Sequence, residues 1–420
     1  MGQYIAIGIF LVVIIAVMTE KIHKTAAALA GVMALLLTRV LNIESAISYV
    51  DFDTIGTLLG MMIFVAVIKE SGIFEYISIK TAKMAKGTPW KILILFMIFT
   101  AVMSTFINNV TTILLVAPMT ISIARMLDLR PEPFLLTQVF ASNIGGTATL
   151  IGDPPNIMIG NAAGLSFLDF VKNTGVVALI SMVVLIVVMK FIYGNKMLTS
   201  TERIKEVMQM DEKKAIADPR LLKKSVIMMV FVIVGFIFGG HYHVEASTVA
   251  MTAAVIMVII NKSDVDRVIL EAEWSTLLFF FGLFIVVGGM VETGVIKVLA
   301  NKLISLTGDN LIITLMVILW GSALLSAVLD NIPFVATLIP LVQAMAADGM
   351  DVAPLWWAIS LGACLGGNGT LVGASANVVA VQVSTKYGYP ISFKDFTKVG
   401  FPVMIGSVII SSIYLIIMYA

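Results

Sequence analysis

The chain has 420 residues, of which 59% are hydrophobic and only 13% are charged, whereas roughly a quarter of the residues in a soluble domain are charged. Its continuous apolar runs reach the ~20 residues that a membrane helix needs, which predicts an all-α polytopic membrane protein and excludes a β-barrel. The net charge of +1 does not favour nucleic acid as a partner, and the single cysteine, Cys364, excludes an internal disulfide.

Twelve apolar segments follow one another along the chain. We expect those of the first half at 4–18, 25–41, 54–68, 90–127, 134–159 and 176–193. We expect those of the second half at 225–238, 246–260, 275–290, 311–345, 355–383 and 399–418. This order predicts a first transmembrane repeat over 1–193, a cytoplasmic linker of mixed charge over 194–224, and a second transmembrane repeat over 225–420.

The two halves repeat each other in their unusual residues. At a spacing of 222 residues, Asn108-Asn109 matches Asp330-Asn331. At a spacing of 221 residues, the pattern Gly-Gly-x-x-Thr-Leu-(Ile/Val)-Gly-x-x-x-Asn occurs at 145–156 and again at 366–377. Internal repeats with interrupted apolar segments in matching positions are typical of secondary transporters.

The charge distribution predicts how the repeats lie in the membrane. If 90–127 and 311–345 are re-entrant hairpins, each half has five crossings, so that the second repeat is inverted relative to the first; the whole chain then has about ten spans and two hairpins. With the N- and C-termini outside and the linker inside, 23 of the 27 Lys and Arg residues lie inside, as the positive-inside rule expects. The exceptions are Arg39, Lys172, Lys297 and Lys302. Two full crossings in place of each hairpin would give the same sidedness.

The interruptions themselves predict a binding site. Unwound backbone at membrane depth is tolerated where protein or a watery cavity surrounds it, and half-helices that end there present free N–H and C=O groups. We expect two hairpin tips and two breaks to converge on one solute. The expected solute-binding residues are Asn108, Asn109, Thr111, Asn143, Gly145, Gly146, Thr147, Thr149, Asn156, Asn331, Gly367, Asn368, Thr370 and Asn377. The alternative is that the glycines only allow close packing of helices.

Two acids are candidates for coupling to protons or a cation. Asp330 lies at a hairpin tip within an apolar segment, where ionisation is costly and usually functional. Its repeat counterpart, Asn108, is uncharged, so one half supplies the titratable group. Asp153 lies in the first break, and either a coupling role or capping of the following half-helix explains it.

The other residues that could carry chemistry have plainer interpretations. Acids near the expected helix ends are read as caps or dipole partners: Asp51, Asp53, Glu70, Glu273 and Glu292. Cys364 is read as a small apolar filler or as a contact to a thiophilic solute. Three scattered histidines (His23, His241 and His243) predict no metal site, and no nucleophile–base set predicts an enzyme or a cofactor.

The motifs also resemble a known group of transporters. SNIGGTATLIGDPPN at 142–156, together with FINNVTTILLVAP and VLDNIPFVATLIP, resembles the ion-transporter superfamily of arsenite permeases, NhaD-type sodium–proton antiporters and P-protein-like transporters. The resemblance implies inverted repeats, hairpins at the midplane, a homodimer and an elevator-like motion. The layout is more distantly similar to dicarboxylate–sodium symporters, but the tips at 108–111 and 330–333 depart from the paired Ser-Asn-Thr motif of that group.

The resemblance leads to three functional hypotheses. The first is proton-coupled efflux of arsenite or antimonite through the inner (plasma) membrane, with an arsenic-handling ATPase as a partner. The second is sodium–proton antiport, in which Asp330 and Asp153 bind a cation and a proton in turn. The third is a passive anion pathway of the P-protein kind.

Overall fold

The computed structural model describes residues 2–19, 21–194, 197–242, 244–307 and 310–419; His243 lies outside these ranges. Within them the chain forms α-helices and two short 3-10 helices, with no strand. Eight of the helices are long and apolar enough to cross a membrane: Gly2–Thr19, Phe52–Lys69, Asn109–Met126, Phe167–Tyr193, Pro219–Tyr242, Trp274–Glu292, Leu311–Val328 and Phe393–Tyr419. The predicted all-α membrane fold is confirmed.

The helices of the second half repeat the order and lengths of the first. The first five pairs are α1 (Gly2–Thr19) with α12 (Pro219–Gly239), α2 (Lys24–Leu37) with α13 (Ala246–Asn261), α3 (Ile43–Ser48) with α14 (Val265–Glu271), α4 (Phe52–Lys69) with α15 (Trp274–Glu292), and α5 (Ile73–Met84) with α16 (Val295–Thr307). The next five are α6 (Pro89–Ser104) with α17 (Leu311–Val328), α7 (Asn109–Met126) with α18 (Asn331–Ala347), α8 (Glu132–Thr147) with α19 (Ala353–Gly366), α9 (Pro154–Ala163) with α20 (Ser375–Lys386), and α10 (Phe167–Tyr193) with α21 (Phe393–Tyr419).

The two interrupted apolar segments at 90–127 and 311–345 are helical hairpins. α7 begins at a cap in which the Asn108 side chain accepts a hydrogen bond from the Thr111 backbone N–H at 2.8 Å. α18 begins in the same way, with Asp330 accepting from the Ile332 backbone N–H at 3.4 Å. Each tip is therefore closed by a polar side chain that satisfies the first free N–H groups of the returning helix.

Each hairpin packs against the broken helix of its own half, and glycine makes the approach possible. A Cβ built on Gly145 would lie 2.2 Å from the carbonyl oxygen of Ala101, and one built on Gly366 would lie 2.6 Å from that of Ala323. A side-chain hydroxyl also ties each break to its hairpin. Thr149 Oγ1 donates to the Thr105 carbonyl at 2.6 Å, and Thr370 donates to the carbonyl of Ala327.

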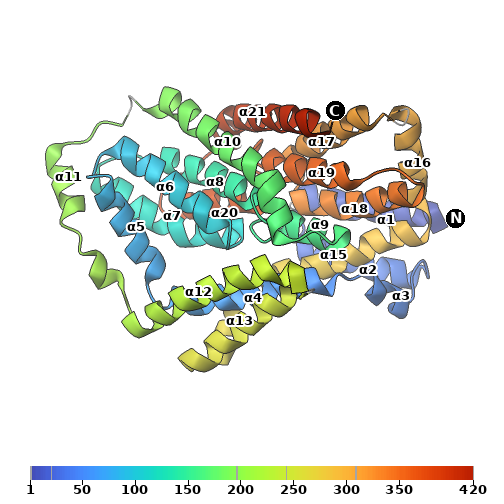
Figure 1. Ribbon diagram of the computed structural model, residues 1–420, viewed down its shortest axis with the longest axis horizontal. Helices are drawn as coiled ribbons and strands as arrows, with labels where there is room; N and C mark the ends of the chain where they lie inside the picture. The colour runs from blue at the N-terminus through green and yellow to red at the C-terminus, as the bar shows by residue number, and fades with distance from the viewer. Residues whose placement is uncertain (1, 20, 195–196, 243, 308–309, 420) are drawn as a thin grey trace.

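The helices form two groups, each built from both halves of the chain (Figure 1). In the first, which we call the scaffold unit (α1–α4 with α12–α15), α4 packs against α13 and α15 packs against α2. In the second, the hairpin unit (α6–α10 with α17–α21), α7 packs against α20 and α18 packs against α9. Figure 1 shows α6, α7 and α8 on the left and α17, α18 and α19 on the right.

The segment between the halves lies against α5 and the first hairpin. It contains α11 (Thr201–Met208) and the 3-10 helix η1 (Glu212–Ala215), and α12 already begins at Pro219, inside the range expected for the linker. Lys83 Nζ donates to Glu212 Oε2 at 2.5 Å, and this hydrogen bond lowers the pKa of Glu212 from its ordinary value. Thr199 Oγ1 donates to the Leu127 carbonyl at 2.6 Å.

Replacing either packed glycine by alanine should destabilise the protein. Gly145→Ala and Gly366→Ala each force a methyl group into the backbone of a hairpin helix, and overpacking of this kind costs about 1–3 kcal/mol. Thermal unfolding in detergent measures the effect. Gly321→Ala is the matched control, because a Cβ at this position in α17 meets no atom within 4 Å. Equal melting temperatures for all three variants would contradict the packing argument.

Candidate functional site

An asparagine network joins the two breaks at the centre of the hairpin unit. Asn143 Nδ2 donates to Asn368 Oδ1 at 2.9 Å and to Asn377 Oδ1 at 3.0 Å, so that it connects the first half to the second. Asn109 Nδ2 donates to Asn143 Oδ1 at 3.2 Å. All four side chains are buried. Most of their hydrogen bonds are made within the protein, although the Nδ2 group of Asn368 has no partner among the residues that the structure describes.

Asn156 and Asn377 hold the unwound backbone of the two breaks in equivalent ways. Asn156 Nδ2 donates to the Thr149 carbonyl at 2.9 Å and contacts the carbonyls of Gly146 and Thr147 at 3.3 Å. Asn377 Nδ2 donates to the carbonyls of Gly367 at 2.7 Å and Thr370 at 2.9 Å. Carbonyls that the sequence analysis expected to face a solute are therefore satisfied by side chains of the same half.

Cys364 belongs to this network. It occupies the position that matches Asn143 at a spacing of 221 residues. Asn143 donates to Asn377 of the second break, and Cys364 Sγ donates to Asn156 Oδ1 of the first break at 3.4 Å. The Ser360 hydroxyl donates to the same oxygen of Asn156 at 2.7 Å. The cysteine is thus a buried polar contact between the halves, rather than only an apolar filler.

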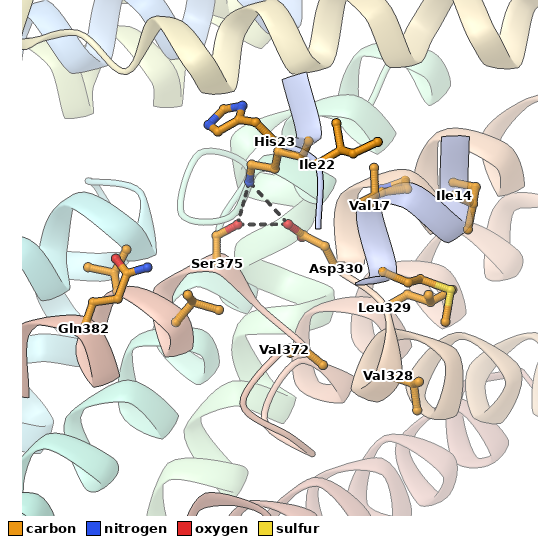
Figure 2. Close-up of a pocket in the computed structure, with 15 residues that line it drawn as sticks. Ile14, Val17, Ile22, His23, Val328, Leu329, Asp330, Val372, Ser375 and Gln382 are labelled. Atoms are coloured by element: carbon orange, nitrogen blue, oxygen red, sulfur yellow. Dashed lines mark hydrogen bonds and ion pairs between the residues drawn. The ribbon is translucent and has the colours of Figure 1, made fainter. Parts of the chain in front are cut away.

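A cavity of about 130 Å³ lies between the two hairpin tips. Its lining comes from both units: Lys24, Leu58, Met62, Asn108, Asn109, Val110, Asp153, Pro154, Glu273, Thr276, Asn331, Ile332, Ser375 and Val379. A second cavity of about 300 Å³ shares Lys24, Ser375 and Val379 with the first and also contacts Asp330 (Figure 2). The two cavities therefore adjoin at the second hairpin tip.

Asp153 faces the opposite half of the chain. Both of its carboxylate oxygens lie 3.4 Å from Asn331 Nδ2, at the tip of the second hairpin, and the side chain is 1% exposed. Although Asp153 is the N-cap residue of α9, its side chain makes no capping hydrogen bond. Of the two interpretations that the sequence left open, the geometry does not support capping, because the carboxylate faces the cavity.

Asp330 lies in a polar cluster at the second tip. Its Oδ2 is 3.5 Å from Lys24 Nζ and accepts a hydrogen bond from Ser375 Oγ at 2.9 Å. Lys24 Nζ also donates to Ser375 Oγ at 3.0 Å. Figure 2 shows Asp330 and Ser375 side by side where α17 ends and α20 begins. The carboxylate is largely buried and has one cationic partner.

Several site residues were missed by the sequence analysis. Lys24 was counted only among the Lys and Arg residues on the inside, and Glu273 only as a dipole partner. In the structure, Glu273 accepts hydrogen bonds from Thr111 Oγ1 at 3.3 Å and from Thr276 Oγ1 at 3.2 Å. Both charged residues stand at the edge of an apolar run, as ordinary interfacial residues do, so no local signal distinguished them.

The residues expected for binding or for coupling thus divide into three groups. Those that line the cavity of about 130 Å³ are Asn108, Asn109, Asp153 and Asn331. Those whose side chains or backbone are used inside the breaks are Asn143, Gly145, Gly146, Thr147, Thr149, Asn156, Gly367, Asn368, Thr370 and Asn377. Thr111 bonds to Glu273, and Asp330 adjoins the cavity. Among the residues that the structure describes, no group of three or more His, Cys, Asp or Glu could hold a metal ion.

Comparison with known proteins places the chain among transporters. The 46 kDa membrane protein of Mycobacterium leprae is 40% identical over 99% of this chain and 98% of that protein, and an uncharacterized transporter of Mycobacterium tuberculosis is equally similar. The P protein of Homo sapiens is 30% identical over 95% of this chain, which spans 58% of that longer protein. The solved structure of the YdaH transporter of Alcanivorax borkumensis shares the fold, with a TM-score of 0.62 and 12% identity over 99% of this chain and 97% of that chain.

The similarity to a family extends over most of the chain. A sequence model described as "CitMHS: Citrate transporter" matches residues 14–362, which include both hairpin tips and the first break. The chain therefore belongs to the CitMHS citrate transporter family and is a membrane transporter.

Proposed function

We propose that this transporter is a proton-coupled antiporter that binds a small inorganic solute in the cavity between the hairpin tips. The observation that carries the proposal is the set of acids at or beside this cavity, Asp153, Asp330 and Glu273, together with Lys24. Ionisable residues inside membrane segments are expensive and usually mark ion or proton pathways. These acids supply groups that can bind a proton and a solute in turn.

The division of the site between two units supports an elevator-like motion. Lys24 and Glu273 belong to the scaffold unit, whereas Asp153 and Asp330 belong to the hairpin unit. Movement of the hairpin unit along the scaffold unit would carry the asparagine network and both tips as one body. The same network explains why the two breaks would move together, since Asn143 bonds to Asn368 and Asn377 of the other half.

The chemistry of the cavity favours a cation such as sodium as the solute. Three acids face one lysine here, and each acid that is ionised adds a negative charge, which attracts cations at short range. The neutral amides that would have favoured arsenite are largely used within the breaks. A citrate or chloride anion would meet like charge at this cavity.

Arsenite or antimonite is the second candidate, and the size of the cavity favours it. A volume of about 130 Å³ suits a small solute rather than a drug-sized one. The hydroxyl groups of a neutral trihydroxide could donate to the acids and to the side-chain oxygens of Asn108 and Asn109. Sodium–proton exchange and arsenite–proton exchange therefore share the same coupling residues.

Purified protein in vesicles with an acidic interior should distinguish the solutes. External sodium is expected to make the interior alkaline, because each cation that enters displaces protons through the acids of the site. Internal pH is read with a trapped fluorescent dye, and sodium, arsenite, citrate and chloride are each added in turn, with empty vesicles as the control. Alkalinisation by arsenite with sodium inert would favour the second candidate. A response only to citrate or to chloride would contradict both.

Neutralising the acids should remove the exchange without unfolding the protein. Asp153→Asn and Asp330→Asn are each expected to reduce solute-driven proton movement to the level of empty vesicles, because an amide cannot take up and release a proton. Asp348→Asn, at an exposed position after α18, is the matched control and should retain exchange. Size-exclusion profiles check folding. Full activity of both variants would rule out these two acids as proton carriers.

A further inference from the structure

The contact between Lys24 and Asp330 joins the scaffold unit to the hairpin unit. Lys24 is the first residue of α2, which packs against α1 and α15, whereas Asp330 caps α18. The two charges are 3.5 Å apart, with side-chain exposures of 28% and 13%. Ser375, the first residue of α20, completes the cluster from the hairpin unit. Figure 2 shows Asp330 and Ser375 of this cluster at the wall of the larger of the two adjoining cavities, which Lys24 also lines.

The first repeat forms the same hairpin without the residues of this cluster. The repeat counterparts of Lys24, Asp330 and Ser375 are Ala246, Asn108 and Pro154, so all three members are absent together from the first tip. The first hairpin is closed without them, because Asn108 caps α7 as Asp330 caps α18. The cluster is therefore an addition to one tip that the architecture itself does not require.

Lys24 has a second set of neighbours on its own unit. Its Nζ lies 5.2 Å from the ring centroid of Phe279, which is in α15. Lys24 also lines the cavity of about 130 Å³ together with Glu273, the N-cap residue of α15. The charged and titratable groups that face the cluster are therefore His23, Glu273 and Asp153. When Asp330 is neutralised, Lys24 can remain with Glu273 and the Phe279 ring inside the scaffold unit.

We propose that Lys24 is a latch that holds the hairpin unit against the scaffold unit whenever Asp330 carries neither a proton nor the solute. This inference rests on the proposed function, because it assigns a regulatory role at the same site. Separation of the pair would leave the Asp330 carboxylate without its cationic partner in a largely buried place, which is costly, whereas Lys24 would keep Glu273 and the Phe279 ring as neighbours. Binding of a proton or a cation to Asp330 removes that cost and releases the hairpin unit.

The latch explains why transport would be an exchange rather than a leak. An empty carrier would be held in place by Lys24, so the hairpin unit could return only after Asp330 had bound a proton or a solute. At the first hairpin tip Asn108 takes the place of the acid, so that its contact with the scaffold unit is the hydrogen bond from Thr111 to Glu273 and not an ion pair of this kind. Strict coupling is thus assigned to a single ion pair between the units.

The ratio of protons to sodium ions moved by reconstituted protein tests the latch. Lys24→Gln is expected to lose the fixed ratio and to release sodium without proton entry, because the empty carrier can then return. Lys24→Arg retains the charge and should keep the ratio. Lys69→Gln is the matched control, since Lys69 pairs with Glu271 at 3.4 Å within the scaffold unit. An unchanged ratio in Lys24→Gln would overturn the proposal.

A measurement that needs no transport separates failure of the latch from failure of the proposed function. If wild-type vesicles exchange no sodium for protons, the sodium proposal fails, and hydrogen–deuterium exchange of the backbone at 329–333 decides the latch. Lys24→Gln and Asp330→Asn should each accelerate exchange at this tip, and the double variant should accelerate it no further, because both remove the same contact. Exchange that is unchanged in Lys24→Gln, or additive in the double variant, would overturn the latch.

Discussion

The need to satisfy backbone groups in a place without water is the constraint on which this structure depends. Two helices stop inside the protein, and their free N–H and C=O groups must find partners there. Asn156 and Asn377 supply these partners by spanning the carbonyls of their own breaks. Gly145 and Gly366 bring each break close enough to a hairpin for the two to pack as one body. The position of each hairpin tip follows from this packing.

The same constraint couples the two halves of the chain. The asparagine network crosses from the first break to the second, and Cys364 takes the place of Asn143 in the reciprocal contact. Buried polar networks rigidify a core to the extent that their members are satisfied. In the hairpin unit, this network joins the breaks of the two repeats to each other.

The two repeats pack alike but differ in their buried acids. Asp330 and Asp153 lie in different halves, and the repeat counterpart of each is uncharged. Both acids lie at the boundary with the scaffold unit, where Lys24 and Glu273 face them across the cavities. In this arrangement the positions that match between the repeats form the hairpins and breaks, and the positions that differ carry the acids on which the proposed exchange depends.

The sequence by itself determined the membrane class, the internal repeat, the hairpins and the breaks, because long apolar runs and matched Gly, Pro and Asn positions are local signals. It also made Asp330 and Asp153 candidates for coupling, since an acid inside an apolar segment stands out. Only the tertiary structure decided which polar groups are used in hydrogen bonds within the protein and which remain available to a solute. Asn143 donates to Asn368 and Asn156 accepts from Ser360, both far away in the chain, and Lys24 is brought to Asp330 across 306 positions. Such pairings depend on how helices of different repeats pack against each other. Hydropathy and residue spacing do not predict this packing, because both are local properties of the sequence.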